Sequence, residues 1–259
     1  MVQRPYVSMS VENHVARIVL DRPPVNALNQ TLVSSLTDIA RELRRDRTAW
    51  LVTVTSGCEV FSAGADLKER AGIPDARIAA TVGRIGTMVQ AWYALPQPVL
   101  VGVDGAALGG GLEFALAADL VIASSRATFG FPEVRLGVIP GAGGTQLLAQ
   151  RIGSAAARKW ILTSRRFTAH EALMDGVADF VYPAGEFARG FTSVVLEVAA
   201  NAPVALRQAK RAIRAASAAA LRAGLTAERA CYIPLIRTKD RKEALRAFLE
   251  RREPHWSGR

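Results

Sequence analysis

Apolar and polar positions alternate at strand spacing near the N-terminus and recur at helical spacing further along the chain. Residues 6–20, YVSMSVENHVARIVL, contain two β-like runs around Glu12 and Asn13, which predict a hairpin. Leucine and isoleucine recur every three or four positions in residues 30–46, which predicts an amphipathic helix with Asn29 as its N-cap. Three apolar runs predict buried strands, namely WLVTVTS at 50–56, PVLVGV at 98–103 and LVIAS at 120–124.

Helical patterns dominate the rest of the chain. Helices are predicted over residues 78–95, 112–118, 145–150, 155–163 and 168–174, and from Phe187 to the end. No internal repeat, linker or low-complexity segment separates the α/β part from the all-helical part that follows it. We therefore expect one continuous domain, with an α/β core over residues 1–200 and a helical extension over residues 201–259.

The composition is that of a folded globular protein. Half of the 259 residues are hydrophobic, and this length can bury a sizeable core. Cys58 and Cys231 lie far apart without a CxxC motif, so we expect a reduced, cytoplasmic protein. The first residues lack the apolar core of a signal peptide. The longest apolar stretch, residues 99–123, contains three acidic residues, and we expect no membrane span.

Positive charge is concentrated at the C-terminal end. Residues 201–259 contain fourteen lysines and arginines and five acidic residues, which accounts for +9 of the net charge of +10. Such a segment can attract the phosphates of a nucleotide-bearing small molecule or of nucleic acid. A solvated helical face explains the same charge pattern. The segment lacks interleaved aromatic residues, which argues against base stacking, so nucleic acid is not the expected partner.

A glycine-dense segment, residues 104–146, contains two glutamates among apolar neighbours. Burying an ionised carboxylate is costly, so Glu113 and Glu133 indicate two proton-handling groups around one substrate. Glu113 lies in the first turn of a short predicted helix after three glycines, and the free amides of such a turn suit developing negative charge. A first-turn glutamate that only complements the helix dipole would give the same pattern.

Two further turns carry possible chemistry. Glu133 follows Pro132 in FGFPEVRLGVIPGAGGT, where rigid turns can fix a side chain for binding, although a solvated loop carboxylate is the alternative. In FSAGADLKER, residues 61–70, small residues allow a ligand to approach the backbone amides closely, although an ordinary strand-to-helix turn also favours them. Together, two donor turns and two carboxylates suit a reaction in which a carbonyl oxygen gains negative charge and a neighbouring carbon exchanges a proton.

Several other chemistries lack their motifs. The three histidines, at positions 14, 170 and 255, share no metal-ligand spacing, so no metal site is expected. The sequence contains no GxGxxG, no GxxxxGK[ST] and no GxSxG. These absences argue against a dinucleotide fingerprint, a phosphate-binding loop and a serine-hydrolase elbow.

Four ordered segments closely resemble the enoyl-CoA hydratase/isomerase, or crotonase, family over essentially the whole chain. They are DRPPVNALN, FSAGADLKER, GAALGGGLEFALAADLVIAS and FGFPEVRLGVIPGAGGTQ. The resemblance implies an α/β fold, a crotonase-like spiral of ββα turns with a C-terminal helical trimerisation region, assembled as a homotrimer or a dimer of trimers. It also implies an acyl-CoA thioester as the substrate, with coenzyme A as part of that substrate and no separate cofactor.

The same resemblance assigns roles to individual residues. It implies that the amides of Ala65 and Gly110 form an oxyanion hole for the thioester carbonyl. Glu113 would activate water for attack at C3, and Glu133 would deliver the proton to C2. Contacts with the substrate and its CoA part are implied for a set of residues around the two donor turns: Ala27, Ala63, Ala65, Asp66, Leu67, Lys68 and Gly110.

The presence of both glutamates favours hydration within this family. The expected reaction is reversible syn addition of water to a trans-2-enoyl-CoA, giving a 3-hydroxyacyl-CoA, as in fatty acid metabolism. A double-bond isomerase or another CoA-thioester enzyme is the alternative. Phe131 stands where some hydratases carry a polar residue, which affects the surroundings of Glu133 but not the acid itself.

The GADLKERA motif and the C-terminal segment ERACYIPLIRTKDRKEALRAFLERREP resemble the methylglutaconyl-CoA hydratase branch, some members of which have been linked to RNA binding. An RNA-binding role through the basic C-terminal helices is therefore a further alternative. A branched substrate with a free carboxylate would need a basic partner, and the candidates are solvated helix charges otherwise: Lys68, Arg70, Arg77 and Arg84. The resemblance also suggests that the basic C-terminal segment lies near the adenosine phosphates of CoA or in trimer contacts.

Overall fold

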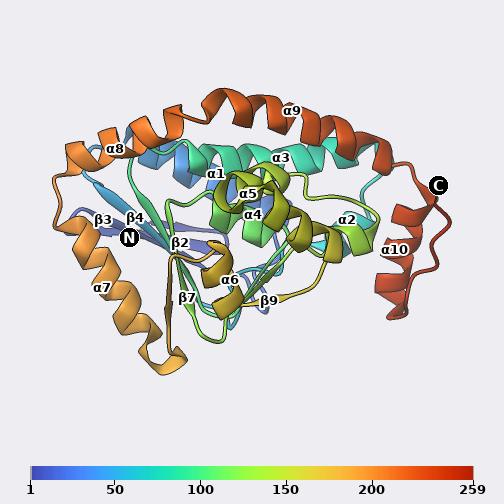
Figure 1. Cartoon of the computed structure of the whole chain (residues 1–259), viewed down its shortest axis with the longest axis horizontal. Coiled ribbons are helices and arrows are strands. Elements are labelled where there is room, and N and C mark those ends of the chain that lie inside the picture. The colour runs from blue at the N-terminus through green and yellow to red at the C-terminus, as the bar shows by residue number, and fades with distance from the viewer. Residues whose placement is uncertain (1, 259) are drawn as a thin grey trace.

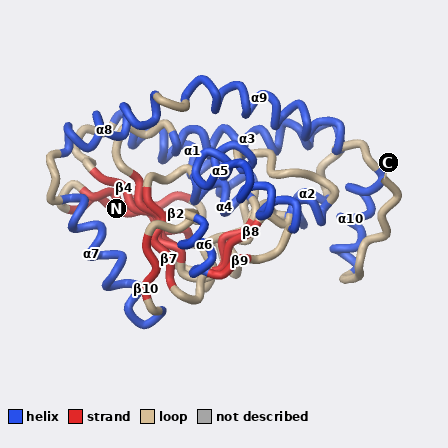
Figure 2. Tube along the Cα trace, viewed as in Figure 1, coloured by secondary structure: helices blue, strands red, loops and turns tan. Residues whose placement is uncertain are grey.

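A seven-stranded sheet, parallel over most of its width, runs through the centre of the molecule (Figures 1 and 2). The computed structural model describes residues 2–258. The strand order is β1-β2-β3-β4-β5-β7-β10, in which β1 to β3 pair antiparallel and the others parallel. The strands are β1 Val2–Arg4, β2 Val7–Glu12, β3 Val15–Leu20, β4 Leu51–Ser56, β5 Val99–Val103, β7 Leu120–Ser124 and β10 Phe180–Tyr182. The predicted hairpin is confirmed as β2–β3, and its turn residues Asn13 and His14 have φ values of 49° and 64°.

A second, three-stranded sheet positions the two glycine-rich turns. Its strands are β6 Ala106–Leu108, β8 Thr128–Gly130 and β9 Phe167–Thr168. Strands β6 and β8 pair parallel with Leu108 opposite Gly130, so the residues that follow each strand emerge at the same edge. These strands have at most three residues, which is too short for an alternating pattern, and the sequence did not predict them.

Ten α-helices and two 3₁₀ helices are found in residues 2–258. They are α1 Gln30–Arg45, α2 Leu67–Ala71, α3 Asp75–Tyr93, α4 Gly110–Leu116, η1 Glu133–Leu136, α5 Gly144–Thr163, α6 Ala169–Asp175, η2 Ala184–Glu186, α7 Phe187–Ala199, α8 Pro203–Ala215, α9 Ala218–Leu235 and α10 Lys239–Glu250. The side chain of Asn29 accepts a hydrogen bond from the Leu32 amide at 2.9 Å, which confirms the predicted N-cap.

Most predicted helix ends differ from the observed ones by up to three residues, and two predictions differ more. The two helices predicted within residues 145–163 are one element, α5, with non-helical backbone at Gly153, where φ is 79°. The prediction that the chain is helical to its end was wrong, because α10 stops at Glu250 and residues 253–258 form no helix. Arg251 ends α10 in the left-handed conformation, and Pro254 cannot continue the hydrogen bonding.

The hydrophobic core lies on both faces of the large sheet. Because its parallel strands are covered on both sides, they carry apolar residues almost continuously, as in VLVGV of β5. Helices α1 and α3 pack against each other beside the main core cluster, in which Trp92 and Phe114 meet edge to face with ring centroids 5.1 Å apart. Helix α7 packs against β7 and β10 and closes a smaller cluster around Phe191.

The C-terminal helices α8 and α9 extend across the molecule beyond α1 and α3 (Figure 1). They are attached through charged as well as apolar contacts. Lys210 of α8 is only 8% exposed and forms an ion pair with Asp119 at 2.6 Å, and Arg214 pairs with the same carboxylate at 2.8 Å. Burial lowers the pKa of Lys210 to about 8, although Asp119 opposes this shift. These two cations therefore belong neither to a solvated face nor to a phosphate-binding patch.

Helix α10 packs against η1, the 3₁₀ turn that begins with Glu133. A Cβ atom at Gly137 would lie only 2.6 Å from Cα of Arg241, so the close approach of α10 requires glycine here. Arg241 is 5% exposed and donates to Asp75 at the start of α3 at 2.8 Å. No helix within residues 2–258 has the length and apolarity to cross a membrane.

Candidate active site

Glu113 and Glu133 line one cavity of about 90 Å³, together with Ala65 and Gly110. Most of the remaining wall is apolar and comes from α3, η1 and the loop before α5. Its lining residues include Val82, Ile85, Leu136, Val138 and Ile139, with Arg70 and Tyr232 as further polar members. The fold therefore brings together all four residues for which the sequence indicated a chemical role.

Glu113 is buried, and its carboxylate does not interact with its own helix. Its Oε1 atom accepts hydrogen bonds from the amides of Ala142 and Gly144, both at 2.8 Å. These amides lie at the N-terminal end of α5, where free N–H groups and the helix dipole stabilise a negative charge. The interpretation as a glutamate that complements the dipole of its own helix was therefore wrong. The helix terminus that stabilises the Glu113 carboxylate is that of α5, which tertiary packing brings close to it.

Burial raises the pKa of Glu113 well above its ordinary value, and the charges of Glu133 and Glu228 add to this effect. The two amide donors of the α5 N-terminus act in the opposite direction because they stabilise the ionised form. The carboxylate thus sits where deprotonation is unfavourable overall but where the anion, once formed, is held in one orientation.

Glu133 begins η1 directly after Pro132, and the alternative of a solvated loop carboxylate was wrong for it. Its Oε2 atom is buried and has no hydrogen-bond partner among the described residues. Burial raises the pKa of Glu133 to about 8, although the nearby Arg70 lowers it. A Cβ atom at Gly109 would lie 2.7 Å from Oε1 of Glu133, so the glycine turn before α4 leaves the space that this carboxylate occupies.

The amides of Ala65 and Gly110 face the same space. A Cβ atom built on Gly110 would lie 3.7 Å from the Ala65 nitrogen, and one on Gly64 would lie 3.2 Å from the Gly110 nitrogen. Within residues 2–258 neither amide donates to a protein acceptor. Gly110 is the first residue of α4, whose amide has no partner within the helix. The pair therefore forms two adjacent unused donors at the cavity wall.

The sequence analysis missed Glu228, a third buried carboxylate, on α9. Its oxygens accept from the amide of Gly143 at 2.7 Å and from that of Thr145 at 3.0 Å. Successive amides of the α5 N-terminus thus alternate between Glu113 and Glu228. Helical spacing in α9 gave no signal for this, because a glutamate on a basic helix looks like a surface residue.

Comparison with known proteins identifies the family. The family model for enoyl-CoA hydratase/isomerase matches residues 10–259. The chain belongs to the enoyl-CoA hydratase/isomerase family.

Individual relatives agree with this assignment. YngF of Bacillus subtilis, named provisionally as an enoyl-CoA hydratase/isomerase, is 41% identical over 97% of this chain and 98% of its own length. The 2,3-dehydroadipyl-CoA hydratase of Escherichia coli is 36% identical over 97% of this chain and 98% of its own. The crystal structure of an enoyl-CoA hydratase from Bacillus anthracis has a TM-score of 0.79 and 38% identity, covering 98% and 100% of the two chains. The predicted crotonase-like α/β fold is confirmed.

In this member of the enoyl-CoA hydratase/isomerase family, a larger space lies next to the cavity. An open groove of about 830 Å³ shares Ala63, Ala65, Leu67 and Pro132 with the cavity wall and leads from it to the surface. Every residue for which the sequence implied contact with substrate or CoA lines the groove or the cavity. The groove holds Ala27, Ala63, Ala65, Asp66, Leu67 and Lys68, and Gly110 lines the cavity.

The N-cap of α2 explains how this helix places residues in both the cavity and the groove. Asp66 caps α2 by accepting from the amides of Lys68 and Glu69, both at 3.1 Å, and its other oxygen pairs with Arg22 at 2.7 Å. The cap fixes the start of the helix, so that Leu67 and Arg70, one turn apart, both reach the cavity.

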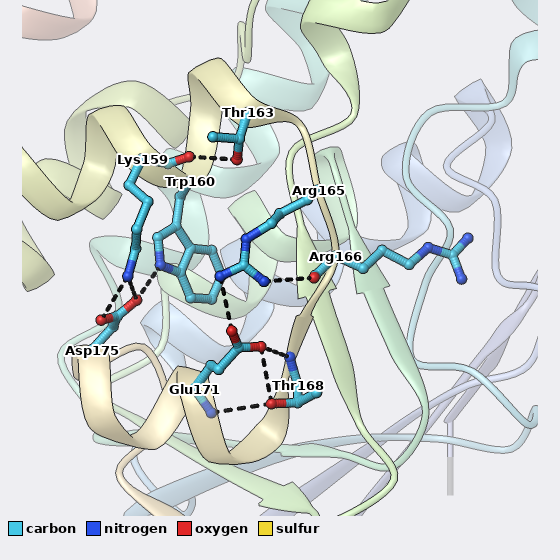
Figure 3. Close-up of polar contacts among 8 residues, drawn as sticks. All are labelled: Lys159, Trp160, Thr163, Arg165, Arg166, Thr168, Glu171 and Asp175. Atoms are coloured by element: carbon cyan, nitrogen blue, oxygen red, sulfur yellow. Dashed lines mark hydrogen bonds and ion pairs between the residues drawn. The ribbon is translucent and has the colours of Figure 1, made fainter.

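The groove wall opposite α2 contains two adjacent arginines with different surroundings. Figure 3 shows Arg165 directed towards Glu171, with which it pairs at 2.8 Å, whereas Arg166 extends away from this cluster. The Arg165 guanidinium also lies 3.7 Å from the ring centroid of Phe167. Arg165 is therefore fixed by the protein, whereas the Arg166 side chain has no polar partner within residues 2–258 and is available to a ligand in the groove.

The basic residues of the groove are not those expected from the charge distribution. They are Arg22, Lys68, Arg135, Arg165 and Arg166. Among the described residues from position 201 onwards only Phe248 lines the groove, so the suggested proximity of the basic C-terminal segment to CoA is not seen within one chain. Of the four candidate partners for a substrate carboxylate, only Arg70 lines the cavity, and Arg77 and Arg84 line a separate depression on α3.

Phe131 is fully buried, and its carbonyl oxygen accepts from the Ser164 hydroxyl at 3.1 Å. Its ring lies near Gly144, at the end of α5 that holds Glu113. An apolar residue here offers no hydrogen bond to Glu133, in agreement with the unpartnered Oε2 atom.

Proposed function

We propose that this protein is an enoyl-CoA hydratase, which adds water reversibly to a trans-2-enoyl-CoA and gives a 3-hydroxyacyl-CoA. The observation that carries the proposal is the pair of buried carboxylates, Glu113 and Glu133, in one small cavity beside two unused amide donors. Family membership supports a CoA thioester as the ligand. Water and a proton are all that the reaction needs besides the substrate, and both can be handled by carboxylates.

In the proposed reaction the Ala65 and Gly110 amides donate hydrogen bonds to the thioester carbonyl oxygen. Addition of a nucleophile at C3 moves negative charge onto the carbonyl oxygen, and two donors stabilise that oxygen most when it is charged. In the proposed reaction the carbonyl oxygen therefore lies between these amides, with the CoA part in the groove and the acyl chain in the cavity.

The different surroundings of the two glutamates indicate different roles in proton transfer. Two ionised carboxylates in one apolar cavity repel each other, so the pair retains one proton near neutral pH. Glu113 accepts two amide hydrogen bonds, which favour its ionised form, whereas Oε2 of Glu133 has no donor. For hydration we infer that the reactive form of the pair has its proton on Glu133, although burial and the charge of Glu133 raise the pKa of Glu113 as well. Glu113 then removes a proton from water as it attacks C3, and Glu133 delivers its proton to C2 on the same face.

The direct test is to incubate the purified protein with crotonyl-CoA and to follow loss of the absorbance of the conjugated enoyl thioester. We expect this absorbance to fall and mass spectrometry to show a product heavier by one water. An unchanged mass with a shifted double bond would indicate an isomerase instead. A folded protein that is inert towards crotonyl-CoA and towards longer and branched enoyl-CoA thioesters would contradict the proposal.

The reaction should show a bell-shaped pH profile of kcat/KM, with an alkaline limb well above the pH at which an ordinary carboxyl group loses its proton. Only the singly protonated pair is active, because hydration uses ionised Glu113 with protonated Glu133 and dehydration uses the reverse. Burial raises the pKa of both glutamates, so the pair keeps its shared proton to a higher pH than an ordinary carboxyl group, and activity falls as this proton is lost at still higher pH. Hydration and dehydration should show the same alkaline limb of kcat/KM. A rate that stays constant or rises through this range would contradict the assignment.

A further inference from the structure

One wall of the acyl cavity carries a positive charge that the proposed hydration does not use. Arg70 of α2 and Tyr232 of α9 line it together, although they stand 162 positions apart in the chain. The Arg70 guanidinium donates to the Tyr232 hydroxyl at 3.2 Å. Within residues 2–258 this is the only hydrogen bond of the Arg70 side chain, and no acidic group forms an ion pair with it.

The two side chains therefore provide donors without a matching acceptor. The guanidinium has five N–H groups and uses one of them on Tyr232. The Tyr232 oxygen accepts that bond, and its own hydrogen has no acceptor in the described part of the chain. Tyr232 is only 4% exposed. Glu133 interacts electrostatically with Arg70 but forms no ion pair with it among the described residues, so a ligand that brings an anion within hydrogen-bond distance of the guanidinium gains a charged contact.

The remaining walls restrict where that anion can be. Val82, Ile85 and Val138 are apolar, and ionised Glu113 repels a second negative group on its side. At about 90 Å³ the cavity has roughly the volume of three water molecules, so it admits only a short chain. The Arg70 and Tyr232 donors are then the one place in this cavity, among its described lining residues, where a carboxylate is favourable.

We propose that Arg70 and Tyr232 form a subsite for a carboxylate at the far end of the acyl chain, so that the substrates are short enoyl-CoA thioesters of dicarboxylic acids. This inference rests on the proposed hydratase function for the location of the acyl chain. The carboxylate accepts two parallel hydrogen bonds from the Arg70 guanidinium and one from the Tyr232 hydroxyl. A planar guanidinium suits this bidentate contact better than an ammonium group does.

The first experiment compares glutaconyl-CoA with the isosteric uncharged enoyl-CoA in which an isopropyl group replaces the terminal carboxylate. We expect the wild-type protein to favour glutaconyl-CoA in kcat/KM. In Arg70→Met the ratio of the two kcat/KM values should fall on the order of 10²-fold, because the carboxylate loses its charged partner. Arg70→Lys should lower the ratio by roughly tenfold, and Tyr232→Phe by less than Arg70→Met. Arg77→Met, an exposed arginine on α3, is the matched control and should leave the ratio unchanged.

A second experiment needs no turnover. Glutaryl-CoA is saturated and cannot be hydrated, and its binding is compared by calorimetry with that of its isopropyl isostere. We expect glutaryl-CoA to bind more tightly, and Arg70→Met to remove that preference. Equal binding of both compounds by the wild-type protein would overturn the subsite.

The outcomes separate this inference from the hydratase proposal. Hydration of crotonyl-CoA without any preference for glutaconyl-CoA would overturn the subsite and leave the hydratase intact. Tighter binding of glutaryl-CoA than of its isopropyl isostere, without turnover of any enoyl-CoA, would overturn the hydratase proposal and retain the subsite. If Arg70→Met lowers kcat/KM equally for both substrates, Arg70 acts on Glu133 rather than on the substrate, and the subsite is wrong.

Discussion

Glu113→Gln and Glu133→Gln should each lower kcat for hydration of crotonyl-CoA by about 10²–10⁴-fold, which is the range for loss of a general base or acid. Glutamine keeps the shape of the side chain but cannot accept or release the proton. At position 113 the amide oxygen can still accept from Ala142 and Gly144, so the loop before α5 should remain in place. The loss of rate then reports chemistry rather than folding.

The measurement is the steady-state rate with crotonyl-CoA, accompanied by circular dichroism and thermal unfolding of each variant. Glu42→Gln, an exposed glutamate on α1 that pairs with Arg4, is the matched control and should retain full activity. Removing the charge from Glu113 or Glu133 also relieves an unfavourable burial, so neither variant should unfold at a lower temperature than the wild type. Full activity in either variant would contradict its assigned role.

Gly64→Ala should lower kcat by roughly 10²–10³-fold, comparable to the loss of one oxyanion-hole donor. The added Cβ would lie 2.7 Å from the Leu108 carbonyl oxygen and 3.2 Å from the Gly110 nitrogen. Backbone atoms cannot give way as a flexible side chain can, so the turn carrying Ala65 must move away from Gly110. Both amides would then no longer point at one oxygen, and the rate with crotonyl-CoA measures the consequence.

Backbone strain needs a separate control, because Gly64 has φ of 88° and alanine is disfavoured there. Gly153→Ala provides it. Gly153 has φ of 79°, and a Cβ there would meet no atom within 4 Å. Both substitutions should therefore cost backbone strain, on the order of 1–3 kcal/mol, but only Gly64→Ala should lose activity at a temperature where both are folded. Equal activities of the two variants would contradict a role for the Ala65 and Gly110 amides.

Much of the fold could be predicted because its signals are local. The hairpin β2–β3, the capped helix α1 and the buried strands β4, β5 and β7 follow from the hydrophobic pattern over a few neighbouring residues. The short strands β6 and β8 could not be predicted this way. They exist because each pairs with a partner distant in the sequence, and that pairing delivers the turns with Gly110 and Glu133 to one edge.

The candidate site was predictable in its residues but not in their surroundings. The motifs placed Glu113, Glu133, Ala65 and Gly110 together, and the cavity contains all four. The sequence could not show that Glu113 binds the N-terminus of α5, since that contact spans about thirty positions. The charge of the C-terminal segment also gave no indication that Lys210 would be buried against Asp119.

By itself, the sequence determined the α/β class, the position of the glycine-rich turns and the identity of the two carboxylates. These features depend on residue type and on spacing within single elements. Only the tertiary structure decided which groups surround them, because Glu228 and Tyr232 reach the site from α9, 85 and 162 positions away from the partners they contact. Burial in that assembled cavity raises the pKa of Glu133 to about 8, and the nearby Arg70 guanidinium forms no ion pair among the described residues. A carboxylate becomes a proton donor near neutral pH only when the fold removes it from water.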